Sequence, residues 1–214
     1  MSDSATAFFA NVLPAHFVKG VAALRAKSGP GSKEALDDVA LSRGAIRLVI
    51  EGEGETWLVV EDGSMRSETA RPDGFVVRMA FGFTAAAAKA AVALLEESGR
   101  MQHPEAPERF ARTASARAEK LLAGQKIEFH IIVKDLPDDA EDVVVKIAIG
   151  GDAPPDKPQF TAAISFDDLE DMREGDITPQ QVLGRLRLTG DASRAMALGM
   201  MLMQPSAQKP QPKK

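Results

Sequence analysis

The sequence predicts an α+β fold, because segments with strand periodicity and segments with helical periodicity both recur along its 214 residues. Apolar side chains alternate with period two in several short segments, as expected for strands that bury one face. They recur at helical spacing in longer segments that follow capping residues. The hydrophobic share of 44% and the charged share of 27% are those of an ordinary globular protein.

The first half reads as a helix, three strands and a second helix. Apolar residues over 5–26 predict the first helix after a Ser4 cap, and Pro14 is expected to kink or split it. A helix from Thr84 to Glu97 is predicted by its alanine run and is expected to end at Gly99. The predicted strands, joined by turns rich in Gly and Asp, are residues 44–50, 57–60 and 75–81.

The second half repeats this order and then extends it. A helix over 108–123 precedes strands at 127–133, 143–149 and 160–166. Asp167, Pro179 and Asp191 then begin three further helices, with a short strand at Leu186–Leu188 before the last one. The similarity of the halves lies in order and pattern. Either the chain carries an internal duplication, or it forms one larger sheet without one.

The predicted organisation has two related units. The first covers residues 1–100 and the second covers residues 108–203. Residues 101–107 contain Pro104 and Pro107 and are predicted to be a linker. Residues 204–214 are rich in Pro, Gln and Lys, which predicts a disordered tail.

Composition argues against several classes of function. A formal charge of −5, with scattered basic residues, predicts no nucleic-acid partner. The chain has no Cys, and its three His residues have no ligand spacing, so we expect no metal, no cofactor and no catalytic site. No long uninterrupted apolar stretch or leader is seen, which predicts a cytoplasmic protein without stable membrane insertion.

Three stretches near the C-terminus resemble the sterol carrier protein family, also called the sterol-carrier lipid-binding domain. They are Phe166–Leu169, Gly175–Gln181, and Gly184–Asp191 with the helix that follows. They are similar to the family's strand, short helix, Pro-Gln-Gln helix, small strand and apolar closing helix. In the first half, Glu51–Trp57 is similar to the family's Gly-rich turn and strand-starting Trp.

The resemblance implies a curved antiparallel sheet with helices over one face and an apolar tunnel between them. The first unit departs from the pattern, because it lacks a fourth strand and a closing helix after Ser98. Either this unit is truncated, or the second unit supplies what it misses.

The residues expected to line the apolar tunnel come from the second half and its last helix. They are Phe110, Phe129, Ile131, Phe160, Ile164, Met172, Met196, Met200 and Met203. Met is flexible and polarisable, which suits a ligand of variable shape. The alternative is that these side chains are core residues that pack the last helix on the sheet.

The resulting prediction is a non-catalytic protein that binds or transfers an apolar, lipid-like small molecule such as a sterol, fatty acyl chain or isoprenoid. The main alternative is a structural or adaptor protein that keeps the fold, fills the cavity with side chains and acts through protein contacts. A third interpretation is an accessory domain that positions an apolar substrate for a separate enzyme. A homodimer through the helix at 84–97 also stays open.

Overall fold

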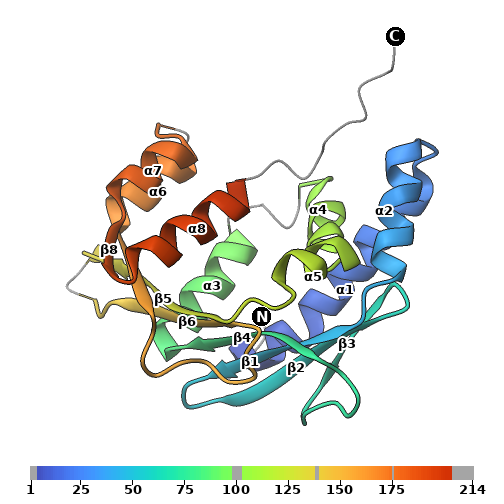
Figure 1. Cartoon of the computed structure of the whole chain (residues 1–214), viewed down its shortest axis with the longest axis horizontal. Coiled ribbons are helices and arrows are strands. Elements are labelled where there is room, and N and C mark those ends of the chain that lie inside the picture. Colours follow the sequence, from blue (N-terminus) through green and yellow to red (C-terminus); the bar gives the residue numbers. More distant parts are fainter. Residues whose placement is uncertain (1–3, 98–102, 138–139, 175, 204–214) are drawn as a thin grey trace.

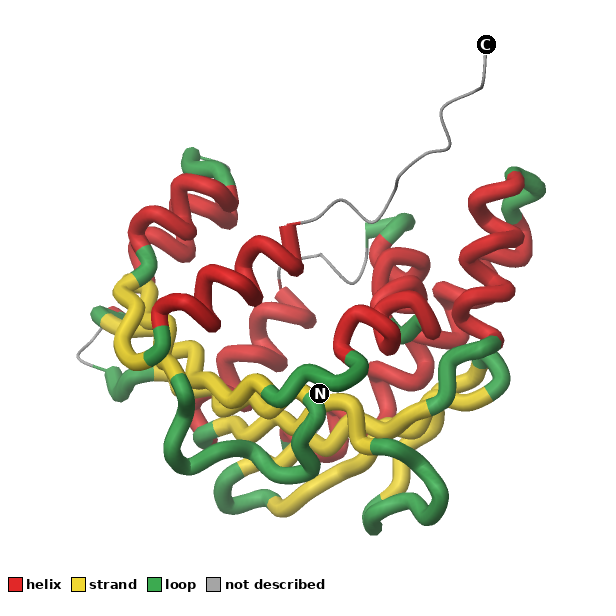
Figure 2. Tube along the Cα trace, viewed as in Figure 1, coloured by secondary structure: helices red, strands yellow, loops and turns green. Residues whose placement is uncertain are grey.

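One eight-stranded sheet runs through both halves of the chain, in the order β3-β2-β1-β4-β6-β5-β7-β8. The computed structural model describes residues 4–97, 103–137, 140–174 and 176–203. The helices lie on one face of the sheet and form two groups (Figures 1 and 2). The fold class is therefore α+β, as predicted.

The first half contributes three helices and four strands. They are α1 (Ala5–Ala26), α2 (Pro30–Ala40), β1 (Gly44–Ile50), β2 (Gly54–Glu61), β3 (Ser64–Glu68), β4 (Val77–Phe83) and α3 (Ala85–Glu97). Ser4 caps α1 by accepting a hydrogen bond from the Ala7 amide, and Thr84 accepts one from the Ala87 amide at the start of α3. Gly99, the expected helix end, lies outside the described residues.

The second half contributes five helices and four strands. They are α4 (Ala106–Thr113), α5 (Ala116–Leu122), β5 (Ile127–Lys134), β6 (Val143–Ile149), β7 (Phe160–Ser165), α6 (Phe166–Glu174), α7 (Pro179–Arg185), β8 (Arg187–Gly190) and α8 (Ala192–Met203). Ala106 and Pro107 of the expected linker lie in α4. The expected disordered tail lies outside the described residues.

The sheet is mixed rather than purely antiparallel, which corrects the expectation taken from the family resemblance. β1 pairs with β4 in parallel, and β5 pairs with β7 in parallel. In the first half the β1-β2 and β2-β3 hairpins are followed by a crossing connection that brings β4 beside β1. In the second half the β5-β6 hairpin is followed by one that brings β7 beside β5. The hairpins themselves are antiparallel, as the alternation predicts.

Several element boundaries differ from the sequence prediction. α1 continues through Pro14, because Phe8, Phe9 and Phe17 bury apolar surface on both sides of the proline. The predicted helix at 108–123 is two helices, since Ser115 leaves the helical conformation and caps α5 through the Ala118 amide. Two elements were missed: α2 and the edge strand β3.

Large apolar side chains fill the space between α1 and the first half of the sheet. Phe8, Phe17 and Leu24 are almost fully buried there, beside residues of β1, β2 and β3. Phe9 stacks on Phe83 of β4, with ring centroids 5.5 Å apart. α1 is long and apolar enough, by length and composition, to cross a bilayer; in the structure its apolar face packs on the sheet.

The close contact of α1 with α4 depends on Gly20. A Cβ atom on Gly20 would lie 1.9 Å from the Pro107 carbonyl oxygen and 2.9 Å from the Ala111 Cβ atom. No side chain fits there, so the two helices meet through backbone. Phe110 packs beside this contact, with its ring centroid 6.3 Å from that of Phe17.

We predict that Gly20→Ala lowers the free energy of unfolding by about 1–3 kcal/mol, because overpacking forces α4 away from α1. Gly31→Ala in α2 is the matched control, since nothing lies within 4 Å of a Cβ atom there. That variant should gain about 0.5–1 kcal/mol from helix propensity. Urea unfolding measures both, and equal effects in the two variants would contradict the contact.

A pH dependence follows from His16, which is 8% exposed beside Phe110. Burial lowers the pKa of His16 below its usual value of 6.5, and the backbone of Ala106 opposes this shift. The unfolded chain therefore binds the proton more tightly than the folded chain. The contribution of neutral His16 to the free energy of unfolding is fully present above pH 6.5. It is lost as the pH falls from 6.5 towards the pKa of the folded protein.

We predict that His16→Phe, which keeps a ring at this position, flattens the loss of stability between neutral and mildly acidic pH. The free energy of unfolding of both proteins, measured by urea titration across that range, provides the check. The same slope in both proteins would show that other groups cause the pH dependence.

Candidate functional site

The helix-covered face of the second half carries a row of apolar side chains that is less covered than the rows beside it. Its members are Val145, Ile131, Ala162 and Leu188 on four adjacent strands, paired in that order. We call these four residues the open row. Ile131 is 37% exposed and Leu188 is 36% exposed, whereas Phe129, Phe160 and Ile164 on the same face are buried. No member is polar.

The row on one side of the open row is covered by α8. Ile147, Phe129 and Phe160 pair across β6, β5 and β7, and all three are buried. The rings of Phe129 and Phe160 stack at 5.1 Å between centroids. Leu198 of α8 is 6% exposed and packs on this cluster.

The row on the other side is covered by the α6–α7 hairpin. Val143, Val133 and Ile164 pair across β6, β5 and β7. Ile177 and Val182 pack on Ile164 and are buried with it. The open row therefore lies between the part of the sheet that α8 covers and the part that the α6–α7 hairpin covers, and these elements can be followed in Figure 1. We call this partly exposed apolar strip of the sheet the groove.

The α6–α7 hairpin is held by a local charge cluster. Arg185 lies 2.5 Å from a carboxylate oxygen of Asp168 and 3.5 Å from one of Asp171. The Arg185 guanidinium, with help from the Ser165 hydroxyl, holds the pKa of Asp168 below its usual value. Thr178 and Gln181 form a capping box at the start of α7. These contacts fix one wall of the groove.

α4 and α5 are joined to the first half by polar and charged contacts. Ser42 and Arg78 hydrogen bond to Glu119 of α5 at 2.7 and 3.0 Å. Lys27, directly after α1, pairs with Glu108 of α4 and holds the pKa of that carboxyl below its usual value. These contacts hold α4 and α5 on the first half, although Leu122 at the end of α5 also packs on the cluster of Ile127, Phe129 and Phe160.

The structure distributes the predicted tunnel residues over several places. Phe129 and Phe160 lie together beneath Leu198, and Ile131 lies in the open row. Ile164 and Met172 belong to the α6–α7 cluster, and Phe110 packs on α1 in the core of the first half. The side chain of Met203 lies outside those that the structure describes.

Met196 and Met200 lie on the outer side of α8, where they are 63% and 60% exposed. At about 100° per residue, each lies roughly 160° around the helix from Leu198. α8 is therefore apolar on two opposite sides. One side anchors it to the sheet, and the other faces solvent.

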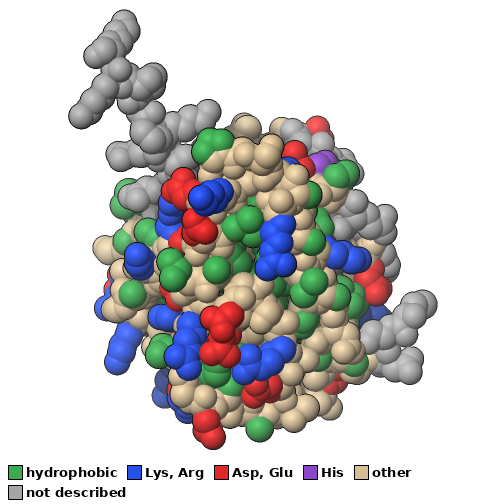
Figure 3. All heavy atoms as spheres, turned by 90° about the vertical axis from the view of Figure 1, so that its right-hand side faces the viewer, with side chains coloured by type: hydrophobic (Ala, Val, Ile, Leu, Met, Phe, Trp, Pro, Cys, Tyr) green, Lys and Arg blue, Asp and Glu red, His purple; other side chains and the backbone are tan. Residues whose placement is uncertain are grey.

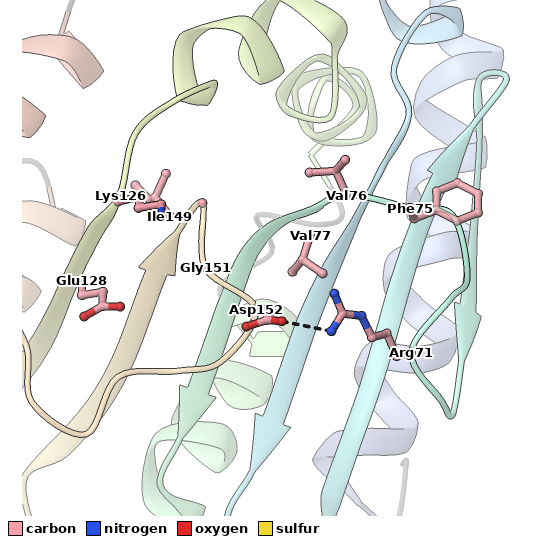
Figure 4. A pocket seen from close by; sticks show the side chains of 10 residues that line it. Arg71, Phe75, Val76, Val77, Lys126, Glu128, Ile149, Gly151 and Asp152 are labelled. Atoms are coloured by element: carbon pink, nitrogen blue, oxygen red, sulfur yellow. Dashed lines mark hydrogen bonds and ion pairs between the residues drawn. The ribbon is translucent and has the colours of Figure 1, made fainter.

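A second hollow, of about 530 Å³, lies on the sheet face away from the helices. It forms where β4 and β6 separate and where the loops at 69–76 and 150–159 meet (Figure 4). Its lining mixes charged and apolar side chains with two glycines: Arg71, Phe75, Val76, Val77, Lys126, Glu128, Ile149, Gly150, Gly151 and Asp152. We call it the polar cleft.

A β-bulge explains why apolar residues reach the polar cleft. Ala45 of β1 pairs with Val77, and the next residue, Ile46, pairs with Met79, so β4 holds one extra residue at Arg78. The predicted alternation over 75–81 therefore changes face at the bulge. Val77 joins Phe75, Ala45 and Trp57 on the face away from the helices.

The electrostatics of the surface give no support for a polyanion partner on the face in Figure 3. Lys and Arg are interspersed there with Asp and Glu. Among the described residues, no group of three or more His, Cys, Asp or Glu could hold a metal ion.

Sequence reasoning missed the polar cleft and the groove as surfaces. The cleft residues come from segments far apart in the chain, and no local motif links Arg71, Lys126 and Asp152. An alternating strand pattern shows which apolar residues share a face of the sheet. It does not show which of them a helix covers, and this is what distinguishes the groove. The Leu186–Leu188 strand was the one available signal, since it placed Leu188 at the sheet edge.

Comparison with known proteins found no matching family model, no matching curated protein and no matching solved structure. The resemblance to the sterol carrier proteins therefore rests only on the residues that carry it.

We predict that Leu198→Ala loosens α8 and costs about 2–3 kcal/mol, because it removes the side chain that packs on Phe129 and Phe160. Met200→Ala, in the same helix but exposed, should change stability by less than about 0.5 kcal/mol. Hydrogen exchange of the α8 amides, together with urea unfolding, distinguishes the two variants. Faster exchange in Met200→Ala than in Leu198→Ala would contradict this packing.

Proposed function

We propose that this chain is a non-catalytic cytoplasmic binding protein that takes one lipid-like apolar molecule in the groove above the open row. The observation that carries the proposal is the exposure of Ile131 beside buried Phe129 and of Leu188 at the edge of the sheet. Each Å² of apolar surface withdrawn from water contributes about 25 cal/mol. A ligand in the groove would bury apolar surface of its own and of the open row, and both areas would contribute to the binding free energy.

The spacing of the strands lets the open row lie under part of one extended acyl chain. The open row crosses three inter-strand spacings, a length of about 14 Å. The neighbouring rows on either side lie about 7 Å away, two residues along each strand. An extended acyl chain laid across the strands would contact all four members. The floor holds no titratable side chain, so binding would be reversible burial without a covalent step.

The second candidate is an adaptor that binds a protein through α8. The exposure of Met196 and Met200 favours it, because large apolar side chains that remain in solvent on a helix are typical of a protein contact surface. The two functions use different surfaces. Lipid binding uses the groove beside α8, and the adaptor uses the outer side of α8.

We predict that Ile131→Glu weakens the binding of a fluorescent long-chain fatty acid at least tenfold, because it places a charge on the apolar floor. Leu41→Glu is the matched control: Leu41 is 74% exposed and lies at the end of α2, on the first half. That variant should bind as the wild type does. Fluorescence titration of the three proteins gives the affinities.

Met196→Glu separates the two candidate functions. It should leave fatty-acid affinity within about twofold if the ligand lies in the groove. Equal fatty-acid binding by Ile131→Glu and the wild type would reject the lipid proposal and leave the adaptor.

A further inference from the structure

The polar cleft lies on the opposite face of the sheet from the groove and has the features of a separate small-molecule site. Its volume of about 530 Å³ falls in the range of ligand pockets, which is about 300–1,000 Å³. It sits where the two loops that cross the hairpins come together. Arg47 donates a hydrogen bond of 2.9 Å to the Asp152 carbonyl oxygen and so holds the second loop on β1.

Two cationic and two anionic side chains line the cleft, and one cation and one anion form an ion pair with each other. Arg71 and Asp152 pair with each other across the junction of the loops, at 3.0 Å (Figure 4). Lys126 and Glu128 remain. Among the described residues, neither the Lys126 ammonium nor the Glu128 carboxylate has a hydrogen-bond or ion-pair partner. One free cation and one free anion therefore border the same hollow.

The apolar part of the cleft is exposed as well. Val76 is 62% exposed at the start of β4, next to buried Val77 and half-buried Phe75. The ring of Phe75 is held between Arg43 and Arg66, whose guanidinium carbons lie 5.1 and 5.4 Å from its centroid. These contacts fix the ring, so an apolar group would meet a rigid surface.

We propose that the polar cleft binds a free amino acid with an apolar side chain. The ligand carboxylate would pair with Lys126, its ammonium with Glu128, and its side chain would cover Val76. A phosphate or another anion would meet the carboxylates of Glu128 and Asp152, and a polyamine would meet Arg71 and Lys126. A zwitterion satisfies both free charges without opposing either.

The test is a titration of the ¹⁵N-labelled full chain with L-leucine, followed by NMR. Shifts are expected at the amides of Gly150 and Gly151, which line the cleft. N-acetyl-L-leucine lacks the ammonium and L-leucinamide lacks the carboxylate, so each should bind at least tenfold more weakly than L-leucine. Glycine lacks the side chain and should also bind more weakly.

Two variants test whether Lys126 and Glu128 pair with the ligand. Lys126→Met and Glu128→Gln should each weaken L-leucine binding at least tenfold, and their melting temperatures control for folding. Lys89→Met is the matched control, since Lys89 is exposed on α3. Absence of cleft shifts with L-leucine, equal binding of L-leucinamide, or unchanged affinity in both variants would overturn the proposal. Binding of inorganic phosphate at the same amides, without L-leucine binding, would also overturn it.

Discussion

The antiparallel pairing of β4 with β6 is the interaction on which the rest of the structure depends. Five residue pairs, from Met79 with Ile149 to Phe83 with Val145, join the last strand of the first half to a strand of the second. Without this ladder β4 and β6 would each be an exposed edge strand of a four-stranded sheet. With it, the apolar face continues across all eight strands. The two halves therefore share one sheet.

This shared sheet determines how the helices are distributed. α4 and α5 fold back on α1 and α2, where Gly20 allows close approach and Glu119 bonds to the first half. In the second half, α8 packs on Phe129 and Phe160, and the α6–α7 hairpin packs on Ile164. The open row between these two contacts is less covered, with Ile131 37% exposed and Leu188 36% exposed.

The same junction produces the cleft on the other face. Where β4 and β6 separate, the bulge at Arg78 directs Val77 away from the helices, and the crossing loops meet through Arg71 and Asp152. The two faces therefore differ in character. One offers an apolar floor without charge, and the other offers balanced charges beside an exposed valine.

The sequence predicted the elements better than their arrangement. Period-two alternation located β1, β5, β6 and β7, because each buries one face in the core. It missed β3, whose single buried apolar residue is Met65. The turn before β3 was nonetheless indicated by the Asp62-Gly63 pair, and both residues have the positive φ that a tight two-residue turn requires.

Long-range features could not be read from the sequence. The parallel pairings depend on connections that cross the hairpins, and alternation is the same in parallel and antiparallel strands. For the candidate site, the pattern placed Phe129, Ile131 and Phe160 on one face, which is how they lie. It could not show that Phe110 packs on the first half, or that Met196 faces solvent. Those outcomes depend on tertiary packing.

Photo-crosslinking with a diazirine-labelled fatty acid tests the central claim most directly, because it reports where a bound chain lies. The account predicts that labelled peptides map to β5, β7 and β8, with labelling reduced by excess unlabelled fatty acid. Labels confined to the first half, or scattered over the surface without competition, would contradict it.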